Sequence, residues 1–346
     1  MKPSTSAISL LIWLISTWMV TPAQFAFAEN TPVIEAPVIE APIIEAQLQA
    51  SYRVEVPDDQ SYDLSGLTLC HSQLLTISDK NNSTIFRLVI DESSNLKSAK
   101  IESAYQIVNI ANIDDLDISG LPLVERFKRW WYRTTEGSRL DWEGISCDNE
   151  TGNLYLVSEE MYGVYQFSPS DPASSRWISS PLFEFAKTQQ ANVFNQFNAG
   201  LEGITFIGDQ FILALERDAA ALMKLTRIDN KLEPKQVTLL PASGIPSIRP
   251  GMSADISDLA IHNNKLYTLE RSISAVCRRD ITTFKPELCL NFYNTENKIK
   301  FKDAKTGLAE GLAIDNDRIY VLTDTNGKSD KSGDRRPILF IFANTL

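Results

Sequence analysis

The chain has 346 residues, with 33 Lys and Arg against 44 Asp and Glu, so its formal net charge is −11. So acidic a chain argues against nucleic acid or anionic lipid as a partner, because both are recognised through an excess of Lys and Arg. Only two histidines are present, which excludes a histidine-rich metal site, and no Gly-x-Ser-x-Gly motif of an α/β-hydrolase occurs.

The N-terminus has the pattern of a secretory signal peptide. Lys2 precedes an apolar stretch, residues 7–20, and Ala26-Phe27-Ala28 gives the small-x-small pattern of a cleavage site. The apolar stretch is shorter than the roughly 20 residues that span a bilayer, which disfavours the alternative, a retained anchor. We therefore expect residues 1–28 to be removed, leaving a periplasmic or secreted protein of net charge −12 with no integral membrane span.

A low-complexity tract follows, with proline every five residues at Pro32, Pro37 and Pro42. Regularly spaced prolines prevent a continuous helix and favour extended chain. Residues 29–50 are therefore predicted to be a stiff linker outside the core, and a strand-like docking segment is the alternative. Residues 51–346 form the predicted domain.

Five segments of this domain share one pattern, in which an acid or a small polar residue and then a glycine, or Asp258 in the fourth segment, precede an apolar run. They are Asp63–Leu67, Asp141–Ile145, Gly200–Ile204, Asp255–Leu259 and Leu308–Leu312. Each is followed by a second apolar run that ends in an acid. These runs are Leu74–Asp79, Leu154–Glu159, Phe211–Glu216, Leu266–Glu270 and Ile319–Asp324.

Turn-forming residues connect the two runs of each repeat, and a third strand often follows, which indicates an antiparallel meander. Taking Gly66, Gly144, Gly203, Asp258 and Gly311 as markers, the repeats are 78, 59, 55 and 53 residues apart. That spacing suits one four-stranded blade per repeat. The sequence predicts an all-β fold, a single β-propeller of five or six four-stranded blades, and we expect a monomer.

The four cysteines lack the spacing of a zinc or redox site, and in an oxidising compartment they permit two disulfides. Cys277 and Cys289 are predicted to pair because they would close a short irregular segment. A bond between Cys70 and Cys147 would link strands that are distant in sequence, and buried unpaired cysteines are the alternative for both pairs.

The acids of the repeats are the candidate metal ligands. In a propeller the innermost strand of each blade lines the central channel, so carboxylates at its start would converge. The predicted ligands are Glu143, Glu202, Asp258 and Glu310, with Ser65 at the same place in the first repeat. Oxygen ligands of this kind suit Ca²⁺. The alternative is structural, in which the acids accept backbone N–H bonds or pair with arginines and so hold the blades together.

Two arginines are candidate contacts for an anionic substrate group. Arg217 and Arg271 each follow an acid that ends the second run of a repeat. The alternative is that they form ion pairs within the protein. The acids of this second ring, which include Glu159 and Glu270, are predicted to face the opposite mouth of the channel or the seams between blades.

Three motifs carry a resemblance to a known family. They are Gly200–Ile204, Ile256–Ala260, and Ala309–Ile314 followed by Tyr320–Gly327. They resemble the phytase-like, or esterase-like, propeller family of bacterial exported proteins over about residues 60–346. The resemblance implies a propeller fold and hydrolysis of phosphoesters or esters. Ser65 departs from the acidic pattern, which puts a complete ring of acids in doubt.

Two hypotheses follow. In the first, a divalent cation, for which the oxygen ligands favour Ca²⁺, supports hydrolysis of a small anionic phosphate or carboxylic ester. In the second, the protein is a non-catalytic propeller that binds a ligand or another protein of the cell envelope. The residues alone assign no catalytic nucleophile, acid or base.

Overall fold

A computed structural model describes residues 38–56, 63–92, 98–107, 116, 118–127, 130, 140–190, 192–195, 200–217, 220–248, 255–299, 308–325 and 328–346. All of them lie within residues 36–346, which form one unit. The expected signal peptide and residues 29–37 of the expected linker lie outside the described residues. None of the helices in the described part is long and apolar enough to cross a membrane.

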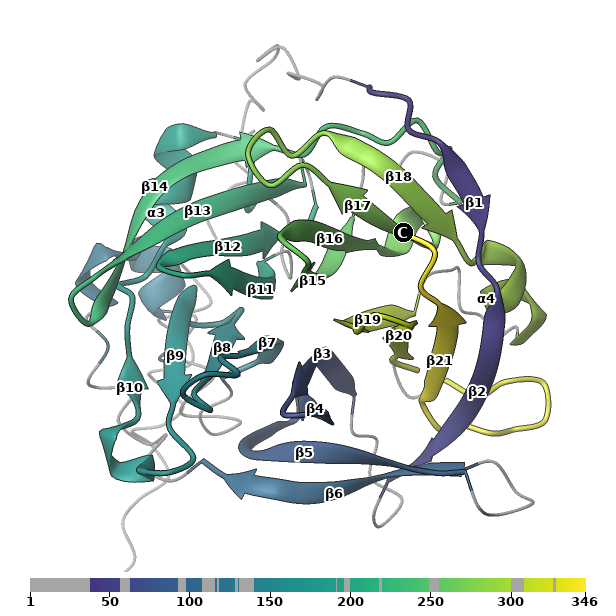
Figure 1. The fold of residues 1–346 in the computed structure, drawn as a ribbon. Helices are drawn as coiled ribbons and strands as arrows, with labels where there is room; N and C mark the ends of the chain where they lie inside the picture. Colours follow the sequence, from purple (N-terminus) through teal and green to yellow (C-terminus); the bar gives the residue numbers. More distant parts are fainter. Residues whose placement is uncertain are drawn as a thin grey trace, which may run out of the picture. The chain divides into compact units, whose positions relative to one another are not determined.

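The described chain is mostly β, as the sequence predicted (Figure 1). Its strands form four hydrogen-bonded sheets, and they divide into five groups when the eight-stranded sheet is counted as two. The first two groups contain β3 (Leu64–Cys70), β4 (Gln73–Ser78), β5 (Asn81–Asp91) and β6 (Ser98–Gln106), and then β7 (Trp142–Cys147), β8 (Leu154–Ser158), β9 (Gly163–Phe167) and β10 (Arg176–Trp177). The third contains β11 (Leu201–Ile207), β12 (Gln210–Leu215), β13 (Ala221–Ile228) and β14 (Lys231–Leu239).

The last two groups take in strands from the start of the chain. The fourth contains β15 (Ile256–His262), β16 (Lys265–Glu270), β17 (Ala275–Arg279), β18 (Pro286–Asn291) and β1 (Ile43–Glu45). The fifth contains β19 (Ala309–Ile314), β20 (Arg318–Thr323), β21 (Ile338–Ala343) and β2 (Leu48–Glu55). Two short helices, α3 (Phe183–Gln189) and α4 (Tyr293–Ile299), and the turns η3 (Ile118–Gly120), η4 (Pro172–Ser174) and η5 (Arg271–Ile273) lie in the connections.

The first strand of each group belongs to one closed ring. β3 contacts β7, β7 contacts β11, β11 contacts β15, β15 contacts β19, and β19 contacts β3 (Figure 1). Apolar side chains fill the space between neighbouring groups, as where Val157 of β8 shares a cluster with Leu213 of β12. Tight turns join the first two strands. In the fourth group both Asn263 and Asn264 have positive φ, which suits a two-residue hairpin.

The N-terminal segment lies along the outside of the fourth and fifth groups. β1 pairs with β18 in parallel, and the backbone N–H of Ile39 donates to the carbonyl of Ala242 at 2.9 Å. Ala41 and Ala46 are buried. Residues 38–50 were expected to belong to a linker outside the core. For this stretch the structure has the docked strand, which the sequence offered as the alternative.

β2 then closes the gap between the fifth and first groups. It pairs antiparallel with β21 and in parallel with β6, where Arg53, Val54 and Glu55 lie opposite residues 98–100. These pairings merge the two groups into a single eight-stranded sheet. Tyr52 and Val54 are buried on β2, so the strand contributes to the core as well as to the hydrogen-bonded ladder.

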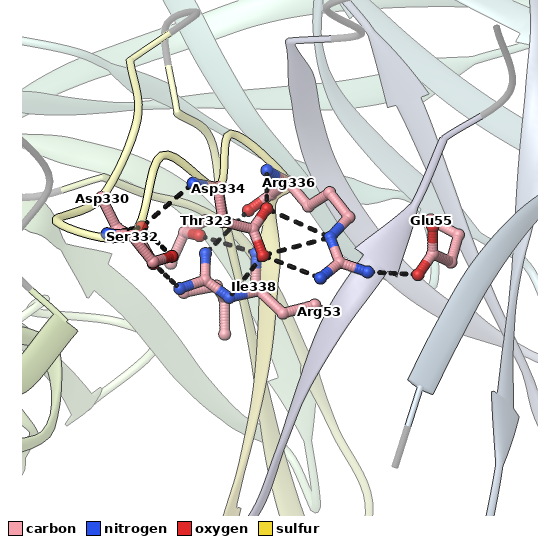
Figure 2. Close-up of polar contacts among 8 residues, drawn as sticks. All are labelled: Arg53, Glu55, Thr323, Asp330, Ser332, Asp334, Arg336 and Ile338. Atoms are coloured by element: carbon pink, nitrogen blue, oxygen red, sulfur yellow. Dashed lines mark hydrogen bonds and ion pairs between the residues drawn. The ribbon is translucent and has the colours of Figure 1, made fainter. Parts of the chain in front are cut away.

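A cluster of ion pairs fixes β2 to the loop before β21 (Figure 2). The Arg53 guanidinium pairs with Asp330 and lies 3.6 Å from Asp334. Arg336 donates to Asp334 at 2.7 Å and pairs with Glu55 across the strand. Because Asp330 and Asp334 also accept backbone N–H bonds within their own loop, the two arginines hold a preformed turn against β2.

The predicted Cys277–Cys289 disulfide is present, and so is the Cys70–Cys147 bond that the sequence left open. Cys277 and Cys289 lie opposite each other on β17 and β18, with their Cα atoms 4.1 Å apart. Cys70 at the end of β3 is bonded to Cys147 at the end of β7, with a Cα separation of 5.5 Å. The second bond joins the first and second groups at the end of the ring where these strands finish.

Candidate metal centre

The two sets of repeat acids lie at the same end of the strand ring. In every group the first residue after the second strand donates its backbone N–H to the residue that precedes the first strand. Examples are Glu159 to Asp141 at 2.9 Å and Glu216 to Gly200 at 3.2 Å. Antiparallel pairing makes this inevitable, because the second strand ends where the first begins. Of the two alternatives for the second set, the opposite mouth of the channel is therefore wrong, and the seams between groups remain. We call this end of the ring the acidic end.

This repeated hydrogen bond also shows which residues are equivalent. The donors are Asp79, Glu159, Glu216, Arg271 and Asp324. In the fourth group the position belongs to Arg271, not to Glu270. The Glu270 side chain lies within its own group, where it accepts from Arg279 at 2.6 Å and from Thr268 at 2.8 Å. The second ring therefore contains four acids and one arginine.

A β-bulge at the start of each first strand carries the acid-Gly pattern. The register between the first two strands shifts at Gly66, Glu143, Ser257 and Glu310, and across Glu202 and Gly203 in the third group. An extra residue at a bulge turns its side chain out of the regular ladder. The residue equivalent to Glu143 and Glu310 in the fourth group is thus Ser257, and Asp258 occupies the position of the glycines.

These glycines and Asp258 form a narrow layer, the glycine waist, defined by Gly66, Gly144, Gly203, Gly311 and Asp258. A Cβ on Gly144 would lie 2.2 Å from the carbonyl oxygen of Glu202, and one on Gly203 would lie 2.6 Å from the nitrogen of Leu259. Glycine is needed because the neighbouring backbones approach so closely.

Asp258 binds three backbone N–H groups within the waist. Its carboxylate accepts from Leu67 of β3 at 3.0 Å, from Leu312 of β19 at 2.7 Å and from Leu259 at 2.8 Å. Burial raises the pKa of this carboxyl well above its usual value, and the three hydrogen bonds oppose that shift. The predicted metal ligand Asp258 therefore has the contacts of the structural alternative, since it ties β15 to β3 and β19.

Glu310 and the two arginines meet in a buried ion-pair cluster. Arg271 donates to both oxygens of Glu310, at 2.5 and 2.6 Å, and to Asp255 at 2.9 and 3.1 Å. It also donates to Glu216 at 2.5 Å, and Arg217 lies 3.0 Å from the same carboxylate. These are the intramolecular pairs that the sequence left as the alternative to substrate binding.

Three carboxylates come together on the other side of the acidic end. One oxygen of each of Asp79, Asp141 and Glu143 lies within 4.8 Å of the others. All three are half-buried. Lys80 lies 2.5 Å from Asp79 and 3.1 Å from Asp63, so it neutralises part of this charge. A carboxylate set of this size and spacing matches the ligands of a hard divalent cation.

The surroundings disfavour ionisation of these groups. Burial raises the pKa of Asp79 to about 6, although Lys80 opposes the shift. Burial, followed by the charges of Glu159 and Asp141, raises the pKa of Glu143 well above its usual value. Burial and the Asp141 charge raise the pKa of Glu159 to about 8. A bound cation would relieve this repulsion between like charges.

The seam between the third and fourth groups gives an internal comparison. There Glu216 and Asp255 occupy the positions that Asp79 and Asp141 occupy between the first and second groups. The guanidinium of Arg271 bridges Glu216 and Asp255. The residue equivalent to Arg271 in the second group is Glu159. The acid pair Glu216 and Asp255 thus has a cationic side chain between its members. The equivalent pair, Asp79 and Asp141, has the further acid Glu159 in place of that arginine.

Glu202, the remaining predicted ligand, is 6% exposed. No hydrogen bond to its side chain is found among the described residues. Burial and then the charge of Glu216 raise its pKa well above the usual value. Of the four predicted ligands, the carboxylate cluster contains Glu143. Asp79 and Asp141 were not predicted as ligands, although the sequence has Asp79 at the end of the second run of one repeat and Asp141 at the start of the next repeat.

Comparisons with known proteins place these features in a family. The family model named phytase-like, described as the esterase-like activity of phytase, matches residues 62–327. A comparison with curated protein sequences found no match.

Among solved structures, the glutaminyl cyclase of Myxococcus xanthus is 12% identical, with a TM-score of 0.50, over 88% of this chain and 97% of that chain. The virginiamycin B lyase of Staphylococcus aureus, solved with quinupristin, is 10% identical, with a TM-score of 0.39, over 83% of each chain. At such identities the first likeness supports a propeller-type fold alone. The family match covers well over half of the sequence, and the chain therefore belongs to the phytase-like family.

Proposed function

We propose that the protein is an exported, divalent-cation-dependent hydrolase of phosphate or carboxylic esters, and that its cation binds to Asp79, Asp141 and Glu143. In this proposal the five strand groups are the blades of one five-bladed propeller. The observation that carries the metal site is the convergence of three carboxylate oxygens within 4.8 Å. The two disulfides support an oxidising compartment.

The donor set favours Ca²⁺, because only carboxylate oxygens are offered and no nitrogen or sulfur ligand is near them among the described residues. When bound, such a cation stabilises negative charge on an ester oxygen and lowers the pKa of a coordinated water. The bridging role of Arg271 at the equivalent seam gives independent support for a positive charge at this position.

Two protein groups would assist the reaction. Glu159 is buried next to the carboxylate cluster, and in its protonated form it would donate a proton to the leaving oxygen. Arg217, whose side chain is 20% exposed at the same end of the ring, would contact the anionic group of the substrate. Arg271, bonded to Glu216, Asp255 and Glu310, would hold this wall of the site in place.

The test combines metal binding with activity. Glu143→Gln should weaken Ca²⁺ binding at least tenfold, since one of three charged ligands is lost, and hydrolysis of p-nitrophenyl phosphate or p-nitrophenyl acetate should fall with it. Calorimetric titration of the metal-free protein and initial rates with and without EDTA measure the two effects. Glu233→Gln is the matched control. Glu233 is exposed on β14, and its substitution by Gln makes the same change of charge as Glu143→Gln.

The outcomes separate the hypotheses. Calcium-dependent hydrolysis that fails in Glu143→Gln and persists in Glu233→Gln supports the proposal. Calcium binding without hydrolysis of any ester in a broad panel contradicts the enzyme and favours the non-catalytic, ligand-binding propeller. Hydrolysis that survives both EDTA and Glu143→Gln contradicts the metal site.

A further inference from the structure

A cavity of about 610 Å³ opens at the other end of the strand ring, where β3, β7, β11, β15 and β19 finish. The turns that follow these strands form its rim, and the last residues of the strands form its walls. The glycine waist lies between this cavity and the acidic end, with the Asp258 carboxylate bonded to three strands across it. A ligand in the cavity is therefore separate from the proposed metal site.

Hydroxyl groups line one side of the cavity. Thr68, Ser146 and Thr205 each lie two residues after a waist glycine, so they occupy equivalent positions on β3, β7 and β11. Ala260 and Ala313 fill the same position on β15 and β19. The wall thus has a polar side formed by three groups and an apolar side formed by the other two.

Two of these hydroxyls belong to buried residues and have no protein partner among the described residues. Ser146 is 8% exposed and Thr205 is 3% exposed. No hydrogen bond to either side chain occurs within the part of the chain that the structure describes. Neither hydroxyl oxygen is among the fully buried side-chain atoms that lack a partner, and both residues line the cavity. Each hydroxyl is therefore available for a hydrogen bond to water or to a ligand in the cavity.

The rim carries an excess of negative charge. Four acids line it, namely Asp148, Glu150, Asp209 and Asp315. The one arginine in the lining is Arg227, and its guanidinium lies over the rings of Tyr155 at 5.0 Å and Phe211 at 4.9 Å. With four acids and one arginine the lining is net negative, and a concave opening of net negative charge attracts cationic ligands.

We propose that this cavity binds a small organic cation, such as a primary alkylamine or a short diamine. The rim carboxylates attract the positive charge, and the hydroxyls of Ser146 and Thr205 accept hydrogen bonds from the ammonium group. Ala260 and Ala313 contact the aliphatic part. The closed waist limits the ligand to a short molecule that enters from the rim.

Calorimetric titration of the mature protein with 1,4-diaminobutane tests this assignment. We expect saturable binding with a dissociation constant of about 1 mM or lower. Thr205→Val removes the hydroxyl while keeping a β-branched side chain, and should weaken binding about tenfold. Asp209→Asn should weaken it about threefold and reduce its salt dependence. The matched control Asp229→Asn removes an exposed acid that does not line the cavity and should change nothing.

Three results would overturn the assignment. The first is the absence of saturable binding. The second is equal affinity for 1,4-butanediol, which has the same length without the charge. The third is loss of diamine binding in Glu143→Gln with retention in Thr205→Val, since that would locate the amine at the acidic end. Circular dichroism checks that each variant is folded. Because Glu143 lies beyond the waist, failure here leaves the proposed hydrolase untouched.

Discussion

At the scale of single residues, chemically similar acids in one sequence pattern have different environments. Glu143 lies in a carboxylate cluster, Glu310 is paired with Arg271, and Asp258 accepts three backbone N–H groups. The pattern predicted that these acids would converge near one end of the ring. It could not assign their partners, because the partners come from other repeats. The bulge of the fourth group shows that Ser257 is the residue equivalent to Glu143. The sequence pattern had aligned Asp258 with Glu143 instead, one residue further along the chain.

The crowded carboxylates predict a pH-dependent stability. Glu159 and Asp79 have pKa values of about 8 and about 6 in the folded protein, above the roughly 4 expected in the unfolded chain. Between about pH 4 and about pH 8 the folded protein therefore binds more protons than the unfolded chain does. Without metal, the free energy of unfolding should fall as the pH rises through this range. Urea unfolding in EDTA at several pH values measures this slope.

Calcium should reverse most of that loss, since a bound cation stabilises the ionised carboxylates. Glu159→Gln should flatten the upper part of the slope, whereas the exposed Glu233→Gln should leave it unchanged. A stability that rises over this pH range in EDTA would contradict the burial of these groups in their neutral form.

At the scale of strands, the first strands of neighbouring groups approach each other so closely at the glycine waist that a Cβ does not fit there. The repeated glycines predicted this, because a residue without Cβ at a fixed place in each repeat indicates a close approach. The second disulfide, Cys70 to Cys147, could not be predicted firmly from spacing. Its geometry depends on β3 and β7 being neighbours in the ring, which becomes apparent only once the ring is closed.

Gly144→Ala should be strongly destabilising, by about 3 kcal/mol or more, because its Cβ would lie 2.2 Å from the carbonyl oxygen of Glu202. Gly208→Ala is the control. Its φ is +54° but nothing lies within 4 Å of the added Cβ, so it should cost only about 1 kcal/mol. Urea unfolding of both variants measures the difference. Equal losses would show that the seam can adjust to a methyl group.

At the scale of the whole molecule, the ends of the chain complete the fold together. The spacing of the repeats predicted a β architecture of repeated units, and the family match agrees with it. The role of the proline-rich segment was harder to predict. Its composition is typical of a linker, and only the unpaired edges of β18 and β21 explain why it forms strands there.

Truncation separates the roles of the two N-terminal strands. Removing residues 38–46 deletes β1, which pairs over three residues at the edge of the fourth group, and should lower the melting temperature by only a few degrees. Removing residues 38–56 also deletes β2, with its buried Tyr52 and Val54 and the Arg53 ion pairs. This variant should show no cooperative thermal unfolding transition. Differential scanning calorimetry compares the two, and equal melting temperatures would contradict a closing role for β2.

The placement of β2 between β21 and β6 has a consequence for biosynthesis. β2 is made before β3 to β20, and its antiparallel partner β21 only after them. A chain that stops before residue 338 therefore leaves open the edges of β2 and β20 that pair with β21, however well its earlier repeats have folded. Such fragments would present open strand edges to quality-control proteases. Synthesis through β21 is therefore a condition for a protected fold.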